Sequence, residues 1–167
     1  MDGPNGSRAR FFLESVAAGL VGYATVAILW VGYNLVQGHS AFYTAALLGA
    51  DLFYGLDSPS ELVVAAGPVL AYNGVHLLAF LAAGFFMRWL AGLAERIPEG
   101  WYLVVILFLI VMPHVFGLPL WFDAPVRAEV PFAYVVLSTS LAALAMGGFL
   151  LAVRPRLRQQ MQEYSDD

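Results

Sequence analysis

The pattern of apolar and polar positions divides the chain into four long, predominantly apolar stretches joined by more polar connections. Each stretch is long enough to cross a hydrocarbon core of about 30 Å, at about 1.5 Å per helical residue. Backbone groups inside a bilayer must be satisfied within the segment, so these stretches predict helices. The expected spans are residues 11–36, 68–90, 101–121 and 131–153.

The connection between the first two spans, residues 37–67, differs from a simple loop. Its first half is too apolar for a free loop and too short for a span. This favours a short helix that lies in the membrane interface or packs across the bundle mouth. Ser58, Pro59 and Glu61 then match a capping-box pattern, which predicts the start of another short helix. Gly67–Pro68 is expected to break or kink that helix before the second span.

The composition indicates that these helices belong to a membrane protein. Only 12% of the 167 residues are charged, whereas soluble domains average about 25%. The first apolar stretch, at about 26 residues, exceeds the 7–15 or so of a signal peptide and is expected to be a retained span. We therefore predict a single-domain, all-α integral membrane protein. It is expected to be a four-transmembrane-helix antiparallel bundle with a short interfacial helical segment on its outer side and a polar tail, residues 154–167.

The basic residues predict the orientation of the bundle. All eight are arginine, and seven of them flank the expected inner ends of the spans, while only Arg127 lies on the other side. Because cytoplasmic loops carry the excess of basic residues, both termini are expected in the cytoplasm. The expected location is the plasma membrane, such as the inner membrane of a bacterium. The net charge of −4, with no basic stripe, argues against a nucleic-acid partner.

Several kinds of chemistry are excluded or disfavoured by the residues present. The chain has no cysteine, which excludes disulfides, thiolate metal sites and iron–sulfur clusters. The nucleophile, zinc-protease and phosphate-loop signatures are missing from the sequence. The spans also lack the paired repeats from which transporters are built. We therefore expect the protein not to be an enzyme.

Two histidines, His76 and His114, lie within the second and third spans, where an ionisable side chain indicates a functional site. His76 lies 12 residues before Arg88 and His114 lies 13 residues after Trp101. At about 1.5 Å per residue, the imidazoles are about 18 and 20 Å above the inner boundary. Neighbouring helices are about 8–10 Å apart. Two inward-facing imidazoles at this depth can therefore share a ligand.

Three interpretations of this pair remain open. His76 and His114 can be the axial ligands of a b-type haem, as in other helix bundles. Tyr72 and Asn73 share a helical face with His76, and this cluster can bind the head group of a quinone. The histidines can instead hold helices together by hydrogen bonds, which is the interpretation preferred from the sequence. Nearby carboxylates are scarce, so no metal other than haem iron is expected.

Other residues indicate how the helices pack. Glu14 is expected to pair with Arg10, one turn earlier. Pairs at small-xxx-small spacing, which let helices approach closely, are Ala18 with Gly22 and Ala143 with Gly147. The expected hydrogen-bond donors to neighbouring helices are Ser138, Thr139 and Ser140. The glycines that would make room for a haem ring are Gly74, Gly84 and Gly117.

These features together predict a small polytopic subunit or accessory protein of a larger membrane complex, with a structural role. Its expected partners are other integral membrane subunits and the lipid bilayer, and an electron-transfer assembly of respiration or photosynthesis would be a natural setting. The alternatives are a b-type haem protein that transfers electrons through His76 and His114, and a quinone-binding membrane protein.

Overall fold

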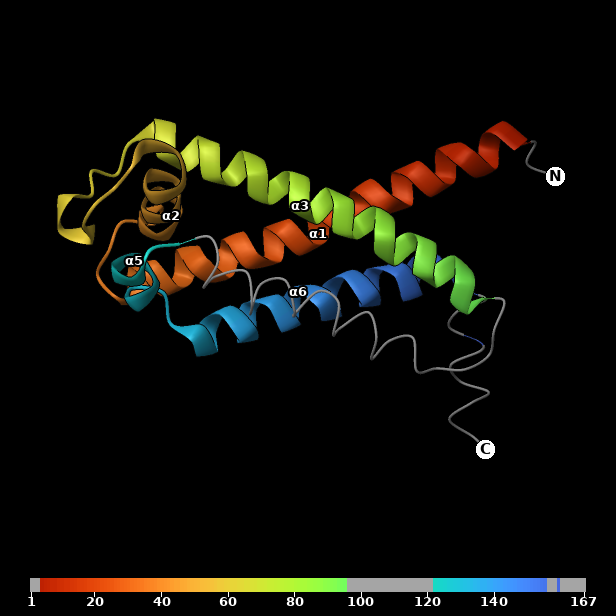
Figure 1. Ribbon diagram of the computed structural model, residues 1–167. Coiled ribbons are helices and arrows are strands. Elements are labelled where there is room, and N and C mark those ends of the chain that lie inside the picture. The colour runs from red at the N-terminus through yellow and green to blue at the C-terminus, as the bar shows by residue number, and fades with distance from the viewer. Residues whose placement is uncertain (1–3, 96–121, 156–158, 160–167) are drawn as a thin grey trace.

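The computed structural model describes residues 4–95, 122–155 and 159, and every regular element within them is helical (Figure 1). Three helices are long and apolar enough to cross a membrane, so the chain is an all-α integral membrane protein. They are α1 (Pro4–Val36), α3 (Ala66–Ala94) and α6 (Phe132–Val153). The shorter elements are α2 (Tyr43–Tyr54), the 3-10 turn η1 (Pro59–Glu61) and α5 (Ala124–Ala128).

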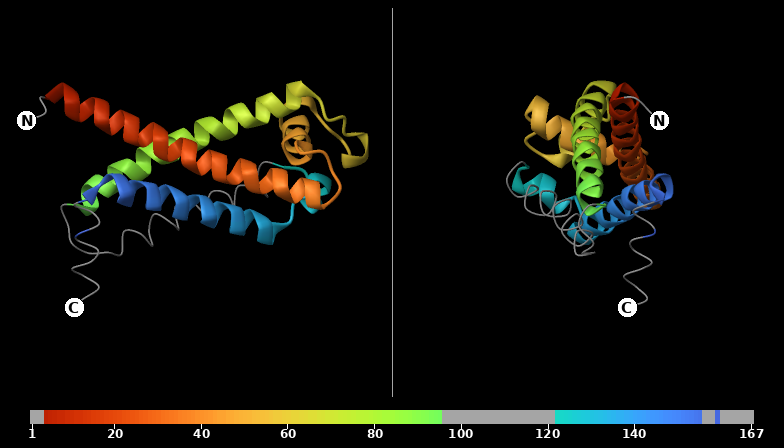
Figure 2. Two further views of the ribbon diagram at one scale, coloured as in Figure 1. Left: turned by 180° about the vertical axis from the view of Figure 1, so that it is seen from behind. Right: turned by 90° about the vertical axis from the view of Figure 1, so that its right-hand side faces the viewer.

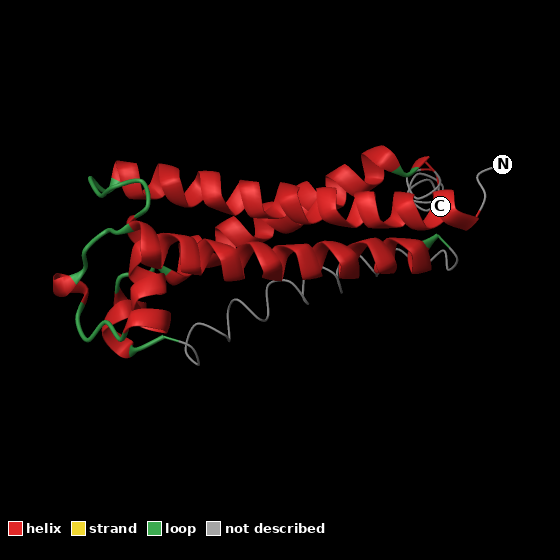
Figure 3. Cartoon of the chain, turned by 90° about the horizontal axis from the view of Figure 1, so that it is seen from above, coloured by secondary structure: helices red, strands yellow, loops and turns green. Residues whose placement is uncertain are grey.

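The three long helices form a bundle in which α1 packs against both α3 and α6. Helices α3 and α6 run in the same direction and α1 runs opposite to them (Figure 2). We call the end that holds the first turn of α1 and the last turns of α3 and α6 the terminal end. The other end holds α2, η1 and α5, and we call it the α2 end (Figures 1 and 3).

The third expected span, residues 101–121, lies outside the described residues. The antiparallel bundle of four spans therefore stays a prediction, and three of its spans are present. The described residues that flank this gap lie at opposite ends of the bundle, since α3 finishes at the terminal end and α5 begins at the α2 end (Figure 1).

Helices α1 and α3 cross at glycines, which lets their backbones touch. A Cβ added at Gly19 would lie only 2.7 Å from the carbonyl oxygen of Phe80, and one at Gly84 would lie 2.6 Å from the backbone nitrogen of Gly19. Gly22, from the predicted small-residue pair of α1, faces the Phe80 ring and Met146 at the same crossing. That motif therefore packs within the bundle, as small residues in membrane helices commonly do.

The expected helix in the connection after α1 is confirmed as α2. Gly55 caps its C-terminus, and the φ of 66° at Gly55 is the left-handed conformation that glycine adopts without steric cost. Its apolar side, which includes Leu47 and Leu48, is buried. Gly49 lies directly against the backbone of Pro68, so α2 packs closely across the first turn of α3.

The expectation for the segment after α2 is wrong in two respects. Ser58 makes no capping bond; its hydroxyl contacts the Ser60 hydroxyl at 2.9 Å, and only a 3-10 turn forms. Helix α3 then begins at Ala66 and continues through Gly67–Pro68 without a break. The reason is positional: Pro68 falls in the first helical turn, where backbone N–H groups have no partner within the helix, so its missing N–H costs nothing.

A network of charged side chains joins the three long helices at the terminal end. The expected pair of Arg10 and Glu14 is confirmed, with 2.9 Å between Nε and Oε1. The other carboxylate oxygen of Glu14 lies 2.5 Å from Arg88 Nε on α3 and 3.1 Å from Arg154, which follows α6. Arg154 also pairs with Glu95, just after α3. The Glu14 side chain is only 9% exposed, so it is the shared anion of a largely buried network.

The acidic residues of this network favour the charged form of Arg154. Burial of the guanidinium acts to lower the pKa of Arg154, but hydrogen bonding to Glu95 and the charges of Glu95 and Glu14 outweigh it. The pKa is therefore raised above its ordinary value, and Arg154 stays charged across the physiological range.

Candidate functional site

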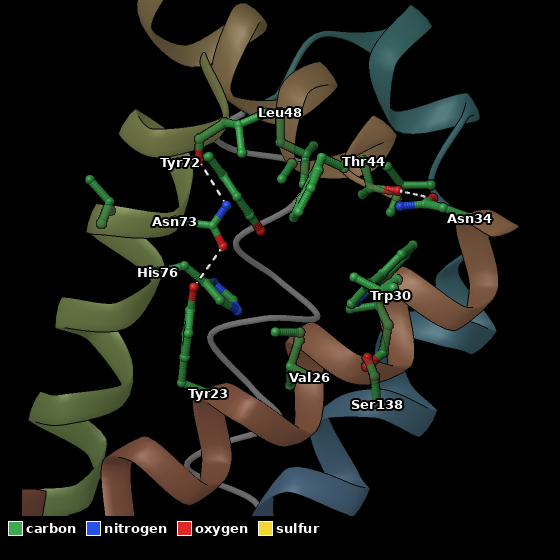
Figure 4. A pocket seen from close by; sticks show the side chains of 18 of the residues that line it. Tyr23, Val26, Trp30, Asn34, Thr44, Leu48, Tyr72, Asn73, His76 and Ser138 are labelled. Carbon is green, nitrogen blue, oxygen red and sulfur yellow. Dashed lines mark hydrogen bonds between the residues drawn. The ribbon is translucent and has the colours of Figure 1, made fainter. Parts of the chain in front are cut away.

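A cavity of about 630 Å³ lies between α1, α2, α3 and α6 near the α2 end (Figure 4). Its position follows from the crossing of the helices: α1 and α3 touch at their glycines and diverge toward the α2 end (Figure 2). Cavities of about 300–1,000 Å³ with apolar walls and a few polar groups are typical of small-molecule sites. The apolar lining includes Val26, Trp30, Val31, Leu48, Leu52, Val69, Phe122, Val130 and Val135.

One wall carries the polar cluster expected from the sequence. Tyr72, Asn73 and His76 all line the cavity from α3, as their helical spacing predicted. Asn73 is held at both ends of its amide: its Oδ1 accepts a hydrogen bond of 2.8 Å from the Tyr23 hydroxyl, and its Nδ2 donates one of 2.8 Å to the carbonyl of Val69. These bonds fix which amide atom is which.

The imidazole of His76 is enclosed by aromatic rings. It stacks on Tyr72, with 5.3 Å between ring centroids and 18° between planes, and meets Phe80 edge-on at 5.0 Å. His114 lies outside the described residues, so a ligand shared by the two histidines stays a prediction. The expectation that Gly84 makes room for a haem ring is wrong, because the backbone of α1 occupies the space beside Gly84.

A second polar pair lines the opposite wall, and it was not expected from the sequence (Figure 4). The Thr44 hydroxyl donates a hydrogen bond of 2.7 Å to Asn34 Oδ1, and Asn34 Nδ2 donates one of 3.1 Å to the carbonyl of Ala41. Both side chains are buried. An amide near the end of an apolar span was a signal that could have identified Asn34.

Helix α6 contributes two buried hydroxyl residues, Ser138 and Thr139. The Ser138 hydroxyl donates to the carbonyl of Val135 at 3.1 Å, within its own helix. The expectation that Ser138 bonds a neighbouring helix is therefore wrong. A serine inside a helix readily bonds a carbonyl of the preceding turn, and this local partner competes with distant ones.

Asp, Glu and Arg are missing from the described residues that line the cavity. Outside the cavity at this end, the Asp51 carboxylate accepts a hydrogen bond of 3.4 Å from the backbone nitrogen of Asp123. Burial raises the pKa of Asp51, the bond from Asp123 opposes this, and the charge of Asp123 adds to it. Within the described ranges, no three His, Asp or Glu side chains gather as metal ligands.

The cavity reaches the surface of the apolar part of the bundle. Leu70 and Val75 line it from α3, yet their side chains are 70% and 52% exposed. Both residues belong to a helix that is apolar enough to span a membrane. The cavity therefore opens beside exposed apolar side chains of this helix.

No protein-family model, curated protein or solved structure matches this chain.

Proposed function

We propose that this protein binds an uncharged, lipid-soluble small molecule within the membrane, and that it does so as a non-catalytic binding subunit. The observation that carries the proposal is the cavity of about 630 Å³, which lies between apolar helices and displays two separate polar groups. A charged ligand is disfavoured, because a charge in an apolar cavity needs a counter-charge. The described residues along these walls include no carboxylate and no guanidinium.

The opening beside Leu70 and Val75 supports a ligand that arrives from the bilayer. Both side chains border the cavity and are exposed on the apolar surface of α3. A molecule dissolved in lipid can reach the site there without crossing water, whereas a water-soluble molecule would have to leave water first. The cavity thus favours lipid-soluble ligands by its position as well as by its walls.

The test is chemical analysis of an organic extract of the purified protein, with Ala27→Trp as the informative variant. Ala27 lines the cavity, so an indole at that position is expected to fill the space and lower the retained ligand by about tenfold, a change of about 1.4 kcal/mol in binding. Ala24→Trp is the matched control, since Ala24 lies on the same helix but is exposed. Equal retention in wild type and Ala27→Trp, or no retained compound in wild type, would refute the proposal.

A second candidate is the accessory subunit expected from the sequence, and the glycines of α6 favour it. Gly147 and Gly148 have no other described atom within 4 Å of an added Cβ, so these two glycines do not serve the packing between α6 and the other described helices. Small residues on such a surface let a partner helix approach closely. We expect wild type to migrate with associated chains in native gels and Gly147→Leu to release them. A wild-type protein that migrates alone would refute this candidate. The two functions are compatible in one protein.

A further inference from the structure

The polar atoms that line the cavity point to a ligand class. We propose that the ligand is a quinone: a flat, uncharged ring with carbonyl oxygens and an apolar tail. This inference rests on the proposed function, that the cavity binds a lipid-soluble molecule, and it adds which molecule the cavity recognises.

The two cavity amides have their oxygens occupied and keep an N–H. Asn73 Oδ1 accepts from Tyr23 and Asn34 Oδ1 accepts from Thr44. Each Nδ2 makes one hydrogen bond, to the carbonyls of Val69 and Ala41 respectively. Because a side-chain amide nitrogen carries two hydrogens, each amide retains one donor for a ligand.

The hydroxyl of Tyr72 adds a third donor. It points into the cavity (Figure 4) and makes no hydrogen bond with the part of the chain that the structure describes. A phenol in an apolar cavity is expected to find a partner, because an unmade hydrogen bond there is costly. The described walls therefore offer a ligand at least two N–H donors and one O–H donor, and a ligand that satisfies them carries acceptors.

The donors lie on two facing walls, which is the arrangement that carbonyls on opposite sides of one ring require. Tyr72 and Asn73 belong to the α3 wall, whereas Asn34 lies on the wall that faces it (Figure 4). Aromatic side chains of Tyr23, Trp30 and Tyr72 line the space between the two walls and suit a flat ring, since aromatic groups stack or meet edge-to-face. The opening beside Leu70 and Val75 gives an apolar tail a path into lipid.

Decylubiquinone is the probe, and quenching of Trp30 fluorescence in nanodiscs is the measurement. Trp30 lines the cavity, so saturable quenching is expected in wild type and in Trp89→Phe, which removes an exposed indole, and is expected to disappear in Trp30→Phe. Tyr72→Phe keeps the ring and removes only the donor, so it should weaken decylubiquinone binding by about tenfold. Tyr54→Phe is the matched control, because Tyr54 is exposed and lies outside the cavity.

Decylbenzene has the same tail and no carbonyl, so it distinguishes recognition of a quinone from binding of any lipid-soluble molecule. We expect it to compete at least about tenfold more weakly than decylubiquinone and to be insensitive to Tyr72→Phe. If decylbenzene competes as well as decylubiquinone, or if Tyr72→Phe binds the quinone normally, the quinone assignment is overturned while binding of a lipid-soluble ligand stands. If decylubiquinone does not quench Trp30 saturably and decylbenzene does not bind either, the proposed function fails as well.

Discussion

Replacing Glu14 with alanine is expected to lower the free energy of unfolding by about 3 kcal/mol, because removing one partner of a buried ion pair leaves the other partner's charge uncompensated. Glu14 is the anion that α1 presents to Arg88 of α3 and to Arg154 beyond α6. Its loss leaves Arg88 in a largely buried position without its nearest carboxylate. Chemical unfolding in mixed micelles, followed by far-ultraviolet circular dichroism, measures the change.

Arg10→Ala is the control for this prediction, because it breaks only the contact within α1. The Arg10 side chain is 63% exposed, and exposed pairs one helical turn apart contribute about 0.3–0.5 kcal/mol. A Glu14→Ala effect as small as that of Arg10→Ala would mean that the network does not hold the helices together.

Replacing Gly84 with leucine is expected to destabilise the bundle by about 3 kcal/mol through overpacking. A Cβ at this position would meet the backbone of α1 at Ser15 and Gly19, and backbone atoms cannot turn aside as a flexible side chain can. Helix α3 would have to move away from α1 at the crossing that shapes the cavity. The same unfolding measurement reports the loss of stability, and ligand binding should weaken with it.

Gly74→Leu tests whether the crossing, rather than the loss of a glycine, causes this effect. Gly74 lies on the same helix and has no described atom within 4 Å of an added Cβ. Leucine has a higher helix propensity than glycine, by up to about 1 kcal/mol. Gly74→Leu should therefore be neutral or mildly stabilising. Similar losses for both variants would remove the argument that backbone contact at Gly84 is required.

The transmembrane helices could be predicted because a bilayer imposes one simple condition, a long apolar segment. The same reasoning identified α2, since residues 43–54 are too apolar for a free loop and too few for a span. It failed at Ser58 and Pro68, where the outcome depends on which residue begins the helix. Shifting that start by a few residues changes Pro68 from a helix breaker to a favourable first-turn residue.

The site could be predicted only along one helix. Tyr72, Asn73 and His76 share a face by spacing alone, and all three line the cavity. Tyr23 bonds Asn73 across 50 positions of sequence, and this pairing depends on how α1 rotates and crosses α3. The glycines that set this crossing are visible in the sequence, but glycine is frequent in membrane helices. The sequence therefore does not indicate which glycines contact the backbone of a neighbouring helix.

The central claim is that a lipid-soluble ring compound occupies the cavity between the two polar walls. Photolabelling of the protein in nanodiscs with an azido-quinone, followed by mass spectrometry of its peptides, tests this claim most directly. The expected result is labelling at residues that line the cavity, such as Trp30 and Tyr72, located by fragmentation of the labelled peptides and suppressed by excess decylubiquinone. Labelling that is confined to exposed residues outside the cavity, such as Ile28 and Leu78, or that excess decylubiquinone leaves unchanged, would contradict it.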